Sequence, residues 1–189
     1  MSDDQTALER LLDLVPPPAD PLFALGSWEE LFTDLGTGLP SDYMALIDAY
    51  GSSDFSDWLG VGDPRRDGHG SSKDAEAREM GDQYRFFRSR WPEDNPFAAW
   101  PEPGGFLSWG NTNDGDHLGW LTVGAPDRWP VALWPRHHGH RVVELTVTEF
   151  LVGWFTGELV GEELPDMPSL TCEPWGCGCG GDCMRQGGR

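Results

Sequence analysis

Basic residues are scarce in this sequence. Its 189 residues include 13 Lys and Arg against 32 Asp and Glu, which gives a formal net charge of −19. Residues 1–64 carry thirteen acids and one base, and residues 91–164 carry eleven acids and three bases. Residues 65–90 alone have a surplus of bases, seven against five acids. Such a charge repels nucleic acid and anionic membranes and attracts basic partners. The alternative interpretation is that the acidity serves solubility alone.

An export signal and a long apolar run are also missing. The apolar segment 11–15 is too short for the core of a signal peptide, and it follows Asp3, Asp4 and Glu9 rather than cations. No run approaches the roughly 20 apolar residues of a membrane-spanning helix. We therefore expect a soluble, cytoplasmic protein.

Sequence motifs of catalysis are absent. No Gly-rich phosphate loop follows a predicted strand, and no HExxH, Ser-x-Gly elbow or paired-carboxylate motif occurs. Residues 111–116 superficially resemble a calcium loop, but Asp116 stands where the sharp turn requires glycine. Thr122 stands where the loop requires a bidentate glutamate. We expect a hairpin turn here, and no enzymatic activity in the chain.

Cysteine does not occur before residue 172. The sequence then contains four cysteines in twelve residues, in the pattern C-x4-C-x-C-x3-C: Cys172, Cys177, Cys179 and Cys183. Four thiolates could surround a tetrahedral Zn²⁺, although structural zinc sites mostly use pairs spaced two to four residues apart. In a reducing cytoplasm disulfides are not expected. A zinc site and a flexible, reduced tail are the two alternatives.

Three histidines occur close together in a predicted turn: His137, His138 and His140. The first two are sequence neighbours, and neighbouring side chains point apart in an extended chain. They make a poor metal chelate for that reason. We expect a solvated turn whose charge changes near neutral pH.

Apolar periodicity predicts five helices. The expected ranges are 2–15, 27–36, 40–51, 73–91 and 146–161. Ser2 or Asp3 is a candidate N-cap for the first helix. Ser27 with Glu30, and Thr146 with Glu149, have the spacing of a capping box, in which side chain and backbone bond reciprocally.

Short alternating runs predict an antiparallel sheet. Residues 117–123, 129–134 and 141–147 are rich in Val, Leu and Trp and are separated by turn-forming clusters, with 106–109 as a lead-in and 57–61 as a further strand. We expect an α+β fold with a mostly antiparallel sheet of about four to six strands and helices packed on it. Trp109 and Trp120 are predicted to be buried against the helices containing Trp28 and Tyr43.

Composition divides the chain into three parts. Residues 1–25 are predicted to form an N-terminal helix and a Pro-rich linker, and residues 26–164 the main domain, with a helical insert near 72–91. Residues 165–189 are rich in Gly and Cys, and we expect a flexible tail there, without packed structure.

Two motifs carry a resemblance to a known family. They are Leu39-Pro40-x-x-Tyr43…Tyr50-Gly51 and Trp109-Gly110…Asp114-Gly115-Asp116…Trp120. In these motifs and in element order, residues 26–160 resemble the SUKH superfamily. Its eukaryotic founders regulate cell-wall assembly, and its many bacterial members look like immunity proteins of polymorphic toxin systems. The resemblance implies a SUKH-like α+β fold and a protein partner. The first helix, the 73–91 helix and the cysteine tail look like additions to it.

Charge and resemblance together lead to one functional hypothesis. We expect a non-catalytic protein-binding module, an immunity protein that occludes a basic toxin, for example one of nuclease type. The candidate contact residues are acids in predicted loops with two aromatic neighbours: Asp54, Phe55, Asp57, Trp58 and Asp63. The alternative is a regulatory or metal-binding adaptor acting through the cysteine cluster.

Overall fold

The computed structural model describes residues 6–65, 73–136, 139–167 and 169–175. The helices of these segments are α1 (Ala7–Leu14), α2 (Trp28–Leu35), α3 (Ser41–Tyr50), α4 (Lys73–Arg90) and α5 (Val147–Phe155). The strands are β1 (Ser53–Phe55), β2 (Leu59–Val61), β3 (Ala98–Ala99), β4 (Gly105–Thr112), β5 (His117–Leu121), β6 (Val131–Trp134), β7 (Arg141–Val143) and β8 (Cys172–Pro174).

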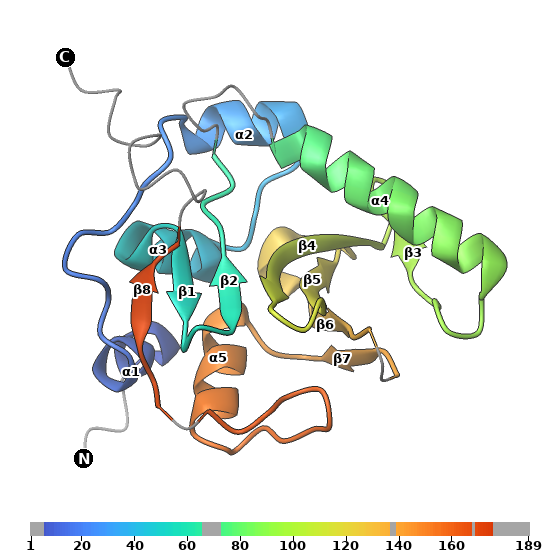
Figure 1. Ribbon diagram of the computed structural model, residues 1–189. Coiled ribbons are helices and arrows are strands. Elements are labelled where there is room, and N and C mark those ends of the chain that lie inside the picture. The colour runs from blue at the N-terminus through green and yellow to red at the C-terminus, as the bar shows by residue number, and fades with distance from the viewer. Residues whose placement is uncertain (1–5, 66–72, 137–138, 168, 176–189) are drawn as a thin grey trace.

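The strands form one sheet in the order β7-β6-β5-β4-β2-β1-β8, and β3 pairs with β4 (Figure 1). All neighbours along this path are antiparallel, whereas β3 runs parallel to β4. The α+β class and the predicted meander are confirmed. The sheet has eight strands rather than four to six, because β1, β3 and β8 are two or three residues long and too short to show alternation.

Local signals placed most helix ends correctly. Ser27 and Thr146 form the predicted capping boxes with Glu30 and Glu149. The cap of α1 is Thr6, which pairs with Glu9, so the predicted cap at Ser2 or Asp3 is wrong. Helix α5 ends at Phe155, well before 161, because the chain reverses at Gly157 with φ +73°.

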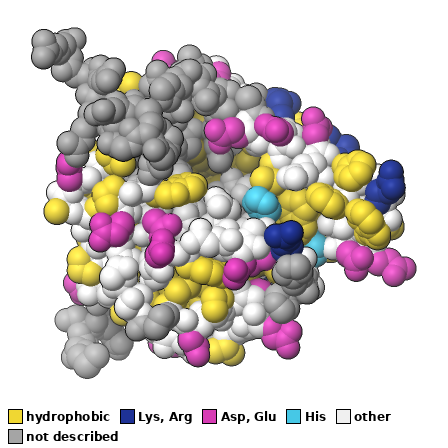
Figure 2. Space-filling view, in the orientation of Figure 1, with side chains coloured by type: hydrophobic (Ala, Val, Ile, Leu, Met, Phe, Trp, Pro, Cys, Tyr) yellow, Lys and Arg dark blue, Asp and Glu magenta, His cyan; other side chains and the backbone are white. Residues whose placement is uncertain are grey.

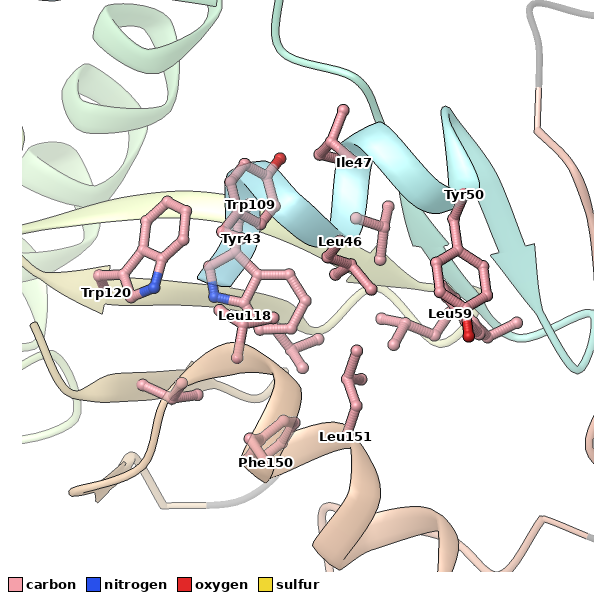
Figure 3. Packing of buried hydrophobic residues seen from close by; sticks show 14 of the residues in the cluster. Tyr43, Leu46, Ile47, Tyr50, Leu59, Trp109, Leu118, Trp120, Phe150 and Leu151 are labelled. Carbon is pink, nitrogen blue, oxygen red and sulfur yellow. The ribbon is translucent and has the colours of Figure 1, made fainter. Parts of the chain in front are cut away.

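The main core fills one face of the sheet, under α3 and α5 (Figure 3), and α1 packs against these two helices. The rings of Trp120 and Tyr43 meet edge to face with centroids 4.9 Å apart. Trp109 contacts Trp120 and Phe150 of α5. Both tryptophans are buried, as predicted. Trp28, however, is half-buried at the edge of the core and stacks near Phe32.

The other face of the sheet is covered by α4 and the segment that follows it. Tyr84 of α4 lies among Phe97, Phe106 and Trp134, with ring centroids 4.6–6.2 Å from its own. Strand alternation explains the two cores, because Leu107 and Trp109 point to one face of β4 and Phe106 points to the other.

Part of the predicted tail belongs to the sheet. Cys172 is 9% exposed and lies opposite Phe55 across the β1–β8 pair. The Trp175 amide donates to the Ser52 carbonyl, and a Cβ at Gly60 would lie 3.0 Å from the Trp175 ring. The expectation of an unpacked tail is therefore wrong for residues 172–175, because β1 needed a second partner along its open edge. Residues 176–189 of the predicted tail lie outside the described residues.

No described helix combines the length and the apolar character that a membrane span requires.

Candidate functional site

The β1–β2 turn and the β4–β5 turn are tied together. Ser56 and Asp57 have φ of 60° and 54°, so the chain reverses sharply before Trp58. The Asn113 side-chain amide donates to the Asp57 carbonyl at 2.6 Å, and the Trp58 indole N–H donates to the Asp114 carboxylate at 3.2 Å. The two turns, 56 residues apart in sequence, therefore form one surface.

Two of the five predicted contact residues have structural roles instead. Phe55 is 1% exposed and packs between Tyr50 and Phe155. The Asp63 side chain is fully buried and accepts hydrogen bonds from the Arg65 guanidinium at 2.6–3.2 Å. A buried aromatic ring and a buried, neutralised carboxylate offer nothing to a partner. The prediction that both residues are surface contacts is therefore wrong. Phe55 lies on the inward face of β1, and Asp63 is paired with Arg65.

The other three predicted residues lie on or near the surface. Asp57 is exposed at the tip of the turn. Trp58 is half-buried, and its ring packs edge to face on Trp154 with centroids 5.4 Å apart. Asp54 is half-buried, and its pKa is raised by burial and, to a lesser extent, by the charge of Asp57. Of the predicted residues, Asp57 is therefore an exposed acid, and it lies beside Trp58, whose ring is held by Trp154.

The structure adds acids that the sequence did not place near Trp58. A concave surface of about 390 Å³, the acidic recess, is lined by Trp58, Asn113, Asp114, Asp116, Arg136, Glu162, Glu163 and Pro165. Four carboxylates face one guanidinium there. Glu162 and Glu163 come from a segment about 100 residues beyond Trp58. They reach it because Trp154 packs on Trp58 and donates its indole N–H to the Pro165 carbonyl at 3.0 Å.

Two of these carboxylates are held in place by the fold. Asp116 accepts from the Arg136 backbone amide at 2.7 Å and from the Thr112 hydroxyl at 3.3 Å. Glu163 is paired with Arg141 at 2.7 Å. These bonds make the wall of the recess rigid, and a rigid charged wall loses little entropy on binding.

The cysteine cluster is represented among the described residues by Cys172, and Cys177, Cys179 and Cys183 lie outside them. Burial raises the pKa of the Cys172 thiol to about 11, so the neutral thiol dominates at pH 7. A metal ligand must be the thiolate. Within the described part of the chain, no three His, Cys, Asp or Glu side chains are grouped for a metal ion.

His140 is half-buried, and its ring lies 4.9 Å from that of Phe97. Burial lowers its pKa, and the charge of Asp94 opposes this more weakly. The expected solvated turn is therefore wrong at His140, whose imidazole belongs to the aromatic packing. His137 and His138 lie outside the described residues.

The position of Cys172 gives a prediction about thiol reactivity. In a variant with Cys177→Ser, Cys179→Ser and Cys183→Ser, the remaining thiol should react at pH 8 at least about 100-fold more slowly in the native protein than in denaturant. Both burial and the raised pKa reduce the exposed thiolate. A disulfide reagent with a coloured product measures both rates. Equal rates would place Cys172 outside the core.

Comparisons with protein-family models, with curated proteins and with solved structures give no match to this chain.

Proposed function

We propose that this chain is a non-catalytic protein-binding module that neutralises a basic toxin by covering it, as the SUKH resemblance implies for a bacterial immunity protein. The chain would act in the cytoplasm of the cell that it protects. The observation that carries the proposal is the acidic recess, in which two separate segments, the β4–β5 turn and residues 162–163, surround Trp58 with carboxylates.

The chemistry of the recess suits a basic partner. Arg141 pairs with Glu163, so four carboxylates stand against the guanidinium groups of Arg136 and Arg141, and a surplus of negative charge remains in a concave surface with an aromatic side chain, Trp58. Interface energy concentrates in such places, where an aromatic anchor is surrounded by groups that exclude water. The net charge of −19 extends the attraction beyond contact distance, so it would speed the encounter with a cationic surface.

Occlusion requires no reaction on this chain. A toxin of nuclease type needs cationic groups to bind the phosphate backbone of its substrate. A carboxylate-lined surface competes for those cations, and the body of the immunity protein blocks access to the site. The partner would therefore be held by charge complementarity and by shape, with the acidic recess at the contact.

The test is co-expression and binding with a basic toxin candidate, sought first among secreted proteins encoded by neighbouring reading frames. The recess variant combines Asp114→Asn and Glu162→Gln in the lining with Asp57→Asn in the turn beside it. These changes leave the structural bonds of Asp116 and Glu163 in place. The wild-type association rate should fall steeply between low and physiological salt while dissociation changes less, and the recess variant should associate about tenfold more slowly.

A matched control removes three charges outside the recess: Glu29→Gln, Glu79→Gln and Glu144→Gln, all at exposed positions. Its association rate should fall less than that of the recess variant. If the wild type neither binds nor protects the cell, the immunity function is wrong. If the recess variant and the control are equally slow, the contact lies elsewhere. Loss of binding on removal of residues 176–189 would favour the cysteine-tail adaptor.

A further inference from the structure

A second concave surface, the aromatic groove, lies between the end of α4 and the sheet. It is lined by Phe87 of α4, by Trp91, Glu93 and Asp94 just after this helix, by His117 of β5 and Trp134 of β6, and by Arg136 and His140. The groove encloses about 1020 Å³. Figure 2 shows hydrophobic side chains gathered beside α4, with histidine and basic atoms among them.

The rings of the groove form a continuous row. The centroids of Trp91 and Phe87 are 6.0 Å apart, those of Phe87 and Trp134 are 6.0 Å apart, and those of Trp134 and His117 are 5.3 Å apart. Behind this row, Tyr84 packs on Trp134 at 4.6 Å and fixes its orientation. Trp91 is 50% exposed, so the open end of the row presents a large aromatic surface to solvent.

The charges of the groove are mostly negative. Glu93 and Asp94 are both exposed, and neither forms an ion pair with another described residue. Arg136 is the cation of the lining, and its backbone amide is bound to the Asp116 carboxylate. The faces of aromatic rings attract cations, and carboxylates at the same surface add to that attraction. An anionic ligand would meet repulsion from both.

The groove is also continuous with the acidic recess. Arg136 lines both surfaces, and the β4–β5 turn contributes Gly115 to the groove and Asp114 to the recess. A single partner can therefore contact the two surfaces together.

We propose that the aromatic groove binds an arginine-bearing segment of a basic protein partner, with the guanidinium stacked on the exposed tryptophan row and paired with Glu93 or Asp94. This inference rests on the proposed function for the partner and names how that partner is held. Arginine suits the groove better than lysine, because its planar group stacks on rings while it donates to carboxylates. The volume is several times that of one side chain, so the ligand is a short segment of chain.

Three blocked pentapeptides test the groove directly: two arginines separated by glycines, and the same peptide with lysine or with glutamate. Nuclear magnetic resonance of the tryptophan indole N–H groups reports where each binds. The arginine peptide should shift the signals of Trp91 and Trp134, the lysine peptide should bind more weakly, and the glutamate peptide should not bind.

Variants of the groove separate stacking from general attraction. Trp91→Ala should lower the affinity for the arginine peptide about fivefold to tenfold, because a desolvated guanidinium–indole contact is lost. Glu93→Gln with Asp94→Asn should lower this affinity about threefold. Arg136→Gln should raise this affinity, since a charge that repels the peptide is removed. The control, Glu29→Gln with Glu79→Gln, removes the same charge outside the groove and should have less effect.

Two results with the peptides would overturn the inference. One is tighter binding of the glutamate peptide than of the arginine peptide. The other is an equal loss of arginine-peptide affinity in the Glu93→Gln/Asp94→Asn variant and in its control. The toxin assay then distinguishes the two proposals. If the wild type protects and Trp91→Ala protects and binds equally well, the groove inference fails while the function stands. If the wild type does not protect, the function fails even where the arginine peptide binds the groove.

Discussion

Replacing Trp120 by alanine is expected to lower the free energy of unfolding by about 3–5 kcal/mol, the range for large-to-small changes in a closed core. Trp120 is 2% exposed. Its ring contacts Tyr43 of α3, Trp109 of β4 and Trp129, so the truncation leaves a cavity with walls from several elements. Those walls can close the cavity only if α3 shifts toward the sheet, and the close packing around it resists that shift.

Chemical denaturation measures the effect, with Trp91→Ala as the matched control. Trp91 is 50% exposed and contacts one ring, Phe87, so its loss should cost less than about 1.5 kcal/mol. A loss below about 1 kcal/mol for Trp120→Ala would mean that this tryptophan is not at the centre of the core. Equal losses for the two variants would contradict the burial difference between them.

Removing β8 is expected to destabilise the protein by about 2–4 kcal/mol, whereas removing the residues after it should not. The comparison is between chains ending at residue 170 and at residue 175. The shorter chain loses the pairing of β8 with β1, the burial of Cys172 and the Trp175 ring over Gly60. It also exposes β1 as an open sheet edge, which promotes association between chains.

Thermal unfolding and light scattering of the two truncated proteins check this result. The chain ending at residue 175 should keep the midpoint of the full-length protein, and the chain ending at residue 170 should unfold several degrees lower. Trp175→Ala in the full-length chain is the milder test, with an expected cost of about 1 kcal/mol, because the ring is only partly covered. Identical midpoints for the two truncated chains would show that β8 adds nothing to the fold.

Predictions that depend on patterns within a few residues are correct. The capping boxes at Ser27 and Thr146 depend on a side chain and an amide three positions apart, so no distant contact is needed to predict them. The reversal at Gly115, with φ +86°, follows in the same way from the glycine itself. The run 117–123 and its lead-in 106–109 predicted strands because Val, Leu and Trp favour a pleated, buried surface, and these segments form β5 and part of β4.

The candidate site was predicted only in part. Asp57 and Trp58 were correctly expected near the surface, but the predicted strand 57–61 begins only at Leu59, and both residues lie in the β1–β2 turn. Phe55 and Asp63 were misassigned because burial depends on what arrives from elsewhere: Phe155 of α5 covers the first, and Arg65 neutralises the second. Glu163 gives no local signal of its position near Trp58.

The sequence alone determined the α+β class, the meander and the acidic character of this protein, because periodicity, turn chemistry and charge are properties of short segments or of composition. The tertiary structure decided which segments meet. It paired β8 with β1, brought Glu163 beside Trp58 and aligned Trp91 with Trp134. Such contacts join residues tens to more than a hundred positions apart. These long-range contacts form only when the whole core folds, because each apolar face must be buried by another element and each open strand edge must pair with another strand.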